Sequence, residues 1–373
     1  MLYWLASYLT TLWGPFRLFS SHLMLLAAGT LAGGLVVWSF LPRLWNLLPT
    51  DRGKILAADK GMKSAGKPTG AGLLISLLVI PVLALFVPMG RWELGVVACL
   101  YLSMLSGYLD DRSSLPWGEF KKGLLDLMVA LLAAYFLFKG QGTDVWLPFY
   151  KQTLHVPPAL YILGAAALLW FTMNATNCSD GVDGLAGSLT LLSLFALAGL
   201  LYGVVGYRPV SDYLLIPHNP DGARWAILVA SMAGSLAGYL WHNAEPSRVL
   251  MGDAGSRLLG MLVGVAVLVA GNPFLIVVVS PVVLVNGGTG LFKLILLRAF
   301  RRIGFDVRPP HMLTQDAAAK QSPLVKALHS IRFPLHDHCR KNMRWSNAQV
   351  LMRFVLIQSF LTPLLFVILV KIR

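Results

Sequence analysis

The residues best suited to chemistry are carboxylates and amides that interrupt apolar stretches of the chain. Asn174, Asn177, Asp180 and Asp183 follow one another at three-residue spacing between two apolar runs. On a helix this spacing would align them on one face. The glycine after each aspartate instead favours a tight turn that brings backbone N–H groups near an anion. A plain loop of Asp-Gly turns is the alternative, and an EF-hand is excluded because the downstream Glu is missing.

Four more polar residues come at or near the ends of apolar runs. Asp110 and Asp111 directly follow a predicted span, and adjacent carboxylates repel each other unless a cation or basic group is near. Capping of the following turn is the alternative. Asp253, in Met251-Gly-Asp-Ala-Gly-Ser256, could cap the apolar helix that follows or hold a metal beside a diphosphate. Asn243 precedes this motif.

Basic residues accompany these acids. Lys67 lies in Gly66-Lys-Pro-Thr-Gly70, and Lys122 begins a predicted span. Each could contact phosphate or simply extend toward lipid headgroups. His336 and His338 flank an aspartate in a basic loop, and contact with phosphates is favoured because the further ligands of a structural zinc site are missing. Oxygen ligands beside lysines suit Mg²⁺ and a substrate that carries phosphates.

The elements that must position these residues are membrane spans. The chain has 373 residues, of which 56% are hydrophobic and only 13% are charged. Repeated apolar runs of about 20 residues predict an all-α polytopic membrane protein. The short alternating segments of a β-barrel are absent. We expect ten transmembrane helices, at residues 21–42, 71–89, 94–109, 123–138, 158–174, 184–206, 223–242, 255–270, 274–299 and 350–371.

The distribution of basic residues predicts the orientation of these spans. Of the 31 Lys and Arg residues, 21 lie in or beside one set of loops and eight lie on the opposite side. The positive-inside rule places the first set, which contains every motif above, in the cytoplasm and both termini outside. The net charge of +14 is then explained by this bias and by anionic lipids, and not by nucleic-acid binding.

We expect a single integral membrane domain over residues 1–373. Residues 1–20 are rich in aromatics and predict an interfacial segment, with no removable signal peptide. Pro281 predicts a kink in the ninth span. Residues 300–349 form the longest cytoplasmic loop, which is basic and amphipathic and is expected to lie on the membrane surface. The three cysteines are too scattered for a disulfide framework or a zinc site.

At these motifs the chain resembles the polyprenyl-phosphate N-acetylhexosamine-1-phosphate transferases. The resemblance spans nearly the whole chain, including the ten-span layout, and its most specific part is Asn174–Ala186. The segment Pro334-Leu-His-Asp-His338 favours the branch that transfers phospho-MurNAc-pentapeptide over the branch that uses UDP-GlcNAc. The other matching motifs are Gly66-Lys-Pro-Thr69, Leu109-Asp-Asp111 and Met251–Ser256.

The resemblance implies a bacterial inner-membrane enzyme that moves phospho-MurNAc-pentapeptide from UDP-MurNAc-pentapeptide to undecaprenyl phosphate. The products would be lipid I and UMP, Mg²⁺ the cofactor, and a second copy of the chain a candidate partner. The resemblance makes Asp253 the Mg²⁺ ligand and assigns the remaining residues as follows: Asp110, Asp111, Asp180 and His336 to catalysis, and Lys67, Lys122, Asn174, Asn177, Asp183, Asn243 and His338 to substrate binding.

The chain departs from the family pattern at three positions. The family commonly has lysine where this chain has Ser114, histidine where it has Asp337, and an aromatic residue where it has Leu250. We therefore make no prediction about uracil stacking at Leu250, and we assign no role to a middle imidazole. The loop that leads to Lys122 is also shorter than the family's.

Two other classes of protein remain as alternatives. The related enzyme that uses UDP-GlcNAc differs in the loop that carries His336 and His338. A transporter should place its ionisable residues inside the spans near the bilayer midplane. The motifs above lie at span ends on one side, which favours an enzyme.

Overall fold

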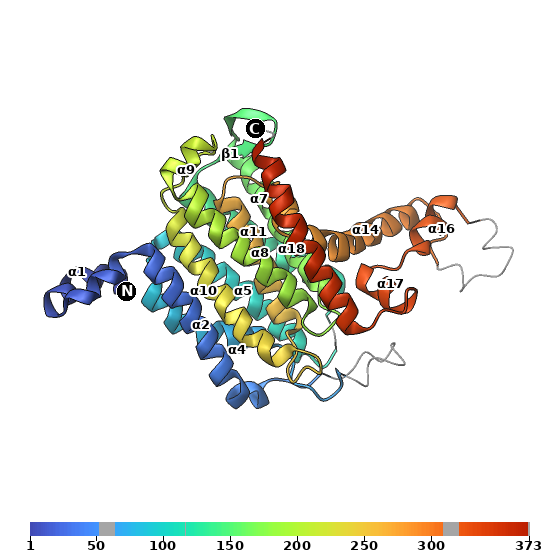
Figure 1. The fold of residues 1–373 in the computed structure, drawn as a ribbon. Helices are drawn as coiled ribbons and strands as arrows, with labels where there is room; N and C mark the ends of the chain where they lie inside the picture. The colour runs from blue at the N-terminus through green and yellow to red at the C-terminus, as the bar shows by residue number, and fades with distance from the viewer. Residues whose placement is uncertain (52–63, 116, 309–320, 372–373) are drawn as a thin grey trace.

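The computed structural model describes residues 1–51, 64–115, 117–308 and 321–371, and these fold into a bundle of long helices (Figure 1). The all-α polytopic prediction is confirmed: nine helices of the described residues are long and apolar enough to cross a membrane. The principal helices are α2 (His22–Leu44), α4 (Ala71–Phe86), α5 (Arg91–Arg112), α6 (Glu119–Gln141), α7 (Pro158–Ser179), α8 (Leu185–Leu200), α10 (Gly222–Asn243), α11 (Gly252–Val269), α14 (Thr289–Arg302) and α18 (Asn347–Lys371).

The second predicted span is shorter than expected. Residues 71–89 were expected to form the second span, and α4 ends three residues earlier, at Phe86, so that its 16 residues make it shorter than the nine helices above. The physical reason is Pro88, because a residue before proline is pushed out of the helical region. Val87 accordingly has an extended backbone, with φ −92° and ψ 117°.

The core of the bundle is formed by α10 and α11, which are almost entirely surrounded by other helices. Helix α10 packs along α2 and α8, and α11 packs against α5 and α7. Small residues make this close packing possible. A Cβ added to Gly33 of α2 would lie 2.6 Å from the backbone oxygen of Ser231 in α10. The result is a rigid centre whose helix ends can hold side chains in fixed positions.

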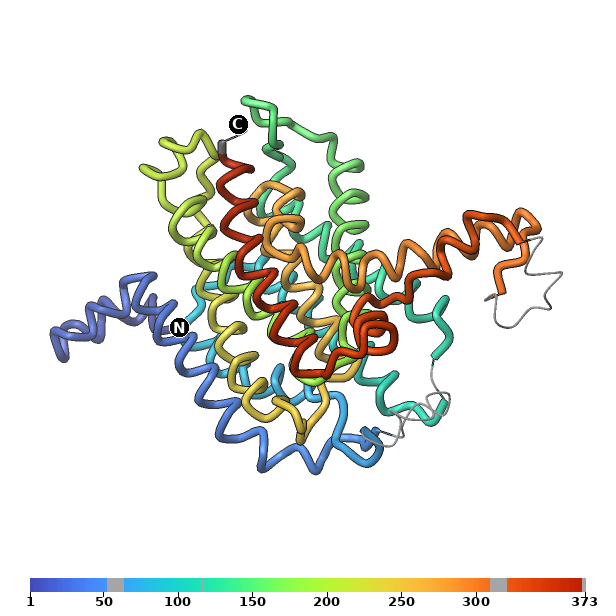
Figure 2. Tube along the Cα trace, turned by 45° about the vertical axis from the view of Figure 1, so that its right-hand side comes forward, coloured from blue at the N-terminus to red at the C-terminus, as the bar shows by residue number. Residues whose placement is uncertain are grey.

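The ninth span is broken where the sequence predicted a kink. Helix α12 (Leu275–Val279) ends before Pro281, which begins the short α13 (Pro281–Val283), and Ser280 between them has a non-helical backbone (φ −132°, ψ 40°). The hydroxyl of Ser193 donates to the backbone oxygen of Val279 at 2.7 Å, which satisfies a carbonyl freed by the break. A π-helical turn (Leu284–Gly288) follows. Helix α14 then runs away from the bundle in both views (Figures 1 and 2).

The segment 300–349, which links the last two predicted spans, contains helices in its described part. It contains α16 (Pro323–Ser330) and α17 (Leu335–Lys341), which follow α14 at the side of the bundle. Residues 309–320 lie outside the described residues. Its placement on a membrane surface stays a prediction.

Three elements flank the bundle elsewhere. The N-terminal segment forms α1 (Leu2–Leu12) and a 3-10 helix (Gly14–Ser20) and extends sideways from α2 (Figures 1 and 2). Its location at a membrane interface stays a prediction. The end of the bundle opposite Gly252 carries an antiparallel hairpin, β1 (Asp144–Leu147) with β2 (Tyr150–His155), and a short helix, α9 (Arg208–Tyr213). Neither was predicted from the sequence.

Candidate active site

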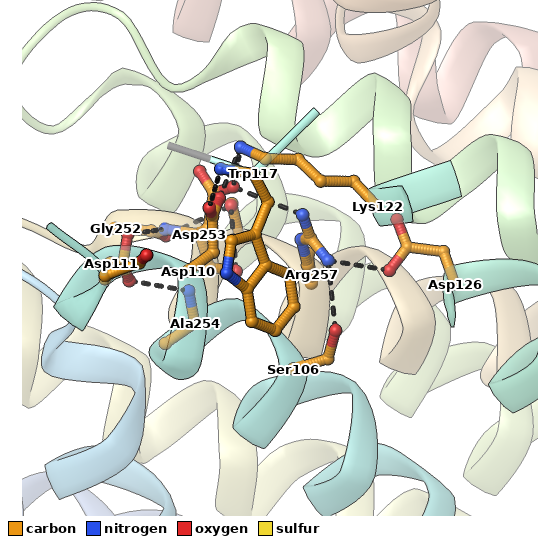
Figure 3. Close-up of polar contacts among 12 residues, drawn as sticks. Ser106, Asp110, Asp111, Trp117, Lys122, Asp126, Gly252, Asp253, Ala254 and Arg257 are labelled. Atoms are coloured by element: carbon orange, nitrogen blue, oxygen red, sulfur yellow. Dashed lines mark hydrogen bonds and ion pairs between the residues drawn. The ribbon is translucent and has the colours of Figure 1, made fainter. Parts of the chain in front are cut away.

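The predicted acidic residues Asp111 and Asp253 meet where α5 ends and α11 begins (Figure 3). Helix α5 continues to Arg112, so Asp111 lies in its last turn and not in a loop. The two oxygens of its carboxylate accept hydrogen bonds from the backbone N–H groups of Asp253 and Ala254, each at 3.0 Å. These are donors that the first turn of a helix leaves unpaired. Asp111 therefore fixes the start of α11, and Asp253 lies in that first turn.

A glycine allows this close approach. Gly252 has φ +70°, and an added Cβ would lie 2.4 Å from a carboxylate oxygen of Asp111 and 2.7 Å from the backbone nitrogen of Gly70. Only glycine combines this conformation with this space. The backbone N–H of Leu250 also donates to Pro68 O at 2.8 Å. The Gly-Lys-Pro-Thr loop and the Met-Gly-Asp loop are thereby held together.

Lys122, in the first turn of α6, joins two of the predicted carboxylates. Its ammonium group forms ion pairs with Asp110 and, at 3.2 Å, with Oδ2 of Asp253. The other oxygen of Asp110 accepts a hydrogen bond from the backbone N–H of Trp117 at 2.8 Å. This contact closes the short loop between α5 and α6. The shorter loop therefore still delivers Lys122 to the acidic cluster.

The Asn174–Asp183 motif is half helix and half turn. The sequence assigned residues 175–183 to a loop, but α7 continues to Ser179, so Asn174 and Asn177 lie on the helix. The amide of Asn174 donates to Trp170 O at 2.9 Å and to Oδ2 of Asp126 at 3.4 Å. Asn174 is thus bonded to α6 and to its own helix. Asp180 follows the last turn of α7.

A second group of predicted residues links three loops beside this turn. Oδ2 of Asp183 accepts a hydrogen bond from the backbone N–H of Ser247 at 3.1 Å and lies 3.8 Å from the ammonium group of Lys67. Lys67 also donates to the hydroxyl of Ser247 at 3.0 Å. The amide oxygen of Asn243 accepts from the N–H of Gly184 at 2.8 Å. In the structure Asn243 therefore orients the loops, and its contact with a nucleotide stays a prediction.

The structure separates the two predicted histidines. His336 is buried, and Oδ1 of Asn286 lies 2.9 Å from its backbone nitrogen and 3.1 Å from its Nδ1. A Cβ added to Gly181 would lie 2.2 Å from Nε2 of His336, so this ring reaches the turn that follows Asp180. His338 instead accepts a hydrogen bond from the backbone N–H of Arg332, in its own segment. His336 therefore lies against the turn that contains Gly181, whereas the hydrogen bond that His338 accepts is within its own segment. The roles of both histidines stay predictions.

Sequence reasoning missed an ion pair beneath the cluster. Arg257 of α11 and Asp126 of α6 are each only 1% exposed and lie 2.9 Å apart. A signal for them existed, because Asp126 follows Lys122 by four residues and Arg257 follows Asp253 by four. Residues at this spacing share a helix face, and ionisable residues inside spans are rarely incidental. Asn286 was also missed, and no pattern pointed to it.

The carboxylates of the cluster fit a Mg²⁺ ion that is bound by few protein ligands. Within the described residues, no group of three or more His, Cys, Asp or Glu side chains converges as a protein-only metal site. Mg²⁺ is commonly held by one or two carboxylates, with waters and substrate phosphates completing its shell. Asp253 and Asp110, both in contact with Lys122, could supply those carboxylates. The cluster therefore combines carboxylate ligands with a lysine suited to phosphates.

The sequence is similar to known proteins over the range that carries the site. The sequence model of glycosyl transferase family 4 matches residues 93–271, the range that contains the acidic cluster and Lys122. The phospho-N-acetylmuramoyl-pentapeptide-transferase of Treponema pallidum (strain Nichols) is 43% identical over 372 residues, covering 98% of this chain and 95% of the relative. The enzyme of the same name from a Nitratiruptor species is 27% identical over 339 residues, 85% of each chain.

The fold and the site together define a polytopic membrane transferase. With the similarity to the Treponema enzyme extending over nearly the full length, the chain belongs to the phospho-N-acetylmuramoyl-pentapeptide-transferase family. The predicted family resemblance is confirmed.

Proposed function

We propose that this protein transfers phospho-MurNAc-pentapeptide from UDP-MurNAc-pentapeptide to undecaprenyl phosphate, forming lipid I and UMP. The observation that carries the proposal is the convergence of Asp110, Asp253 and Lys122 from three helices at one end of the bundle. The names of the relatives specify the muramoyl substrate. The apolar helices and the bacterial relatives support a bacterial inner-membrane location.

The reaction requires control of charge more than transfer of a proton. The second pKa of a phosphomonoester is near ~6, so the acceptor lipid phosphate is largely dianionic at neutral pH. It must approach a diphosphate that is also anionic. Lys122 within the cluster and Lys67 beside Asp183 offset this repulsion and orient the phosphates. Mg²⁺, held by Asp253, would stabilise the charge on the departing UMP.

The acceptor phosphate attacks the β-phosphorus directly in this proposal, without a covalent enzyme intermediate. Asp180 then positions the reacting phosphates from the end of α7, close to the turn that His336 reaches. The alternative is a two-step reaction in which the Asp180 carboxylate is the nucleophile.

We also propose that the site faces the cytoplasm and that both termini lie outside. The support is the excess of Lys and Arg in the loops on the site side, where 21 lie against eight on the opposite side. A homodimer stays a prediction.

The proposal is tested by radiolabelled transfer to undecaprenyl phosphate, with the purified full chain in lipid nanodiscs. We expect UDP-MurNAc-pentapeptide to give labelled lipid and UMP, and chelation of divalent cations to stop the reaction reversibly. Asp253→Ala is the matched negative control. Transfer from UDP-GlcNAc in place of the muramoyl donor would contradict the assigned substrate, and unimpaired turnover with excess chelator would contradict the assigned cofactor.

A further inference from the structure

The buried ion pair Arg257–Asp126 has no role in the function proposed above. Both side chains are 1% exposed, and each belongs to a helix that crosses the membrane. A buried ion pair seldom stabilises a fold more than apolar residues of similar volume would. Charged residues inside spans are also costly and commonly functional. The pair therefore requires an explanation other than stability.

The contacts of Arg257 show what it orients (Figure 3). Its Nη1 donates to Oδ1 of Asp126 at 2.9 Å and to the hydroxyl of Ser106 at 3.3 Å. Its Nη2 donates to Oδ2 of Asp253 at 3.2 Å. Because a guanidinium group is planar and rigid, fixing one nitrogen on α5 and α6 fixes the direction of the other. Arg257 thereby holds the Asp253 carboxylate in one orientation.

The charge of this contact matters as much as its geometry. Oδ2 of Asp253 is also 3.2 Å from the ammonium group of Lys122. The carboxylate that would hold the divalent ion is therefore already in contact with two positive charges. Lys122 is partly exposed on its side chain and can move to a phosphate, whereas Arg257 is held by Asp126. A fixed cation at this distance opposes the binding of a second cation.

We propose that the Arg257–Asp126 pair positions Asp253 and weakens its affinity for a free divalent ion, so that Mg²⁺ is retained only together with the nucleotide diphosphate. The diphosphate supplies the negative charge that Asp253 alone, between two cations, does not. Arg257 acts through Asp253 and is a positioning residue. This inference rests on the proposed function, because it takes Asp253 as the metal ligand.

The first test measures binding of Mn²⁺, as a probe for Mg²⁺, to the full chain in nanodiscs without substrate, by the electron paramagnetic resonance signal of free Mn²⁺. We expect Arg257→Met to bind Mn²⁺ about tenfold more tightly than the wild type, since one fixed positive charge is removed. Addition of UDP should tighten binding to the wild type more than to Arg257→Met. An unchanged or weaker affinity in Arg257→Met, including no binding by either protein, would overturn the proposal.

Two further variants keep the proposal testable if Arg257→Met does not fold. Asp126→Asn leaves Arg257 without its carboxylate and should weaken Mn²⁺ binding. The double variant Asp126→Asn/Arg257→Met removes both charges and should bind with an affinity between those of the wild type and Arg257→Met. Thermal unfolding identifies any variant that is not folded. A folded double variant with wild-type affinity would overturn the charge argument.

The conservative variant separates orientation from charge. Arg257→Lys retains the positive charge, but its single ammonium cannot reproduce the rigid fork. We expect its Mn²⁺ affinity to match the wild type while its kcat falls about tenfold, as for loss of a residue that orients a metal ligand. A wild-type kcat in Arg257→Lys would contradict the proposal that Arg257 orients the Asp253 carboxylate. Failure of the wild type to make lipid I would refute the proposed function and leave the Mn²⁺ result to be judged separately.

Discussion

The two ends of the bundle both carry carboxylates paired with basic residues, and they differ in how those pairs are made. At the end away from the site, Arg224 pairs with Asp221, three residues earlier, and lies 3.8 Å from Glu93. At the site end, Asp253 is joined to Asp111 across 142 positions of the sequence and to Lys122 across 131. The first cluster is mainly local to the start of one helix, whereas the second connects three helices.

Burial separates the arginines at the two ends of the bundle as well. The side chain of Arg224 keeps 33% of its surface exposed, whereas that of Arg257 keeps 1%. A partly exposed ion pair contributes little to stability and needs no other role. A buried set of charges is retained only where its members satisfy one another or serve a ligand. Charge at a span end is therefore weak evidence for a site, and convergence of buried charges is strong evidence.

The largest loss of activity is expected from a comparison of two aspartates, Asp253 and Asp221, that each lie at the start of a helix. Asp253→Ala should lower transfer to undecaprenyl phosphate by about 1,000-fold, since it removes the proposed metal ligand and a fixed charge at the reacting phosphates. Asp221→Ala, at the start of α10, should stay within about twofold of the wild type. Initial rates at saturating Mg²⁺ measure both, and thermal unfolding checks the fold. Equal losses in the two variants would erase the distinction.

A pair of glycines gives the next largest difference. Gly252→Ala should lower activity roughly 100-fold, because its Cβ would displace Asp111 and the start of α11, and small misplacements of reacting groups are costly. Gly271→Ala, at the other end, has a similar φ of +75°, and its nearest neighbour is a side-chain carbon of Trp146 at 3.2 Å. It should lower the melting temperature while leaving turnover per folded molecule unchanged. Active Gly252→Ala protein would contradict the assigned constraint.

The substitution Asp180→Asn tests whether the turn that follows α7 contributes to the reaction. We expect turnover to slow by about tenfold without being abolished, because direct attack forms no bond between Asp180 and phosphorus, and an amide keeps the size of the carboxylate but loses its charge. Rapid quenching with labelled donor and no acceptor, followed by mass spectrometry, detects any phospho-sugar on the protein. A label trapped on Asp180 would refute direct attack and favour the covalent route.

The smallest effect is expected at the opposite cluster. Arg224→Gln should change the free energy of unfolding by about 1 kcal/mol or less and leave kcat and KM unchanged, because its ion pairs are partly exposed. Chemical unfolding and steady-state kinetics in nanodiscs provide the measurements. A marked loss of turnover would show that the two clusters are coupled through the bundle.

Much of the architecture could be predicted because hydropathy and backbone chemistry are local. All ten predicted spans are helical, and the break before Pro281 lies where the missing backbone donor required it. The spans were placed too short at the site end, since α5 and α7 continue through polar residues to Arg112 and Ser179. Hydropathy marks the apolar part of a helix, whereas hydrogen bonds and capping partners decide where it stops.

The sequence by itself determined the class of protein, the spans and the residue types of the site, because each depends on neighbours along the chain. Only the tertiary structure decided which charges meet. It showed that Asp111 binds the start of α11, that Asn286 holds His336, and that Arg257 joins Asp126 to Asp253. Arg257 and Asp253 lie four residues apart on α11, whereas the other contacts join different elements of the fold. For those contacts the packing of the bundle, and not the spacing of residues along any one helix, brings the partners within hydrogen-bonding distance.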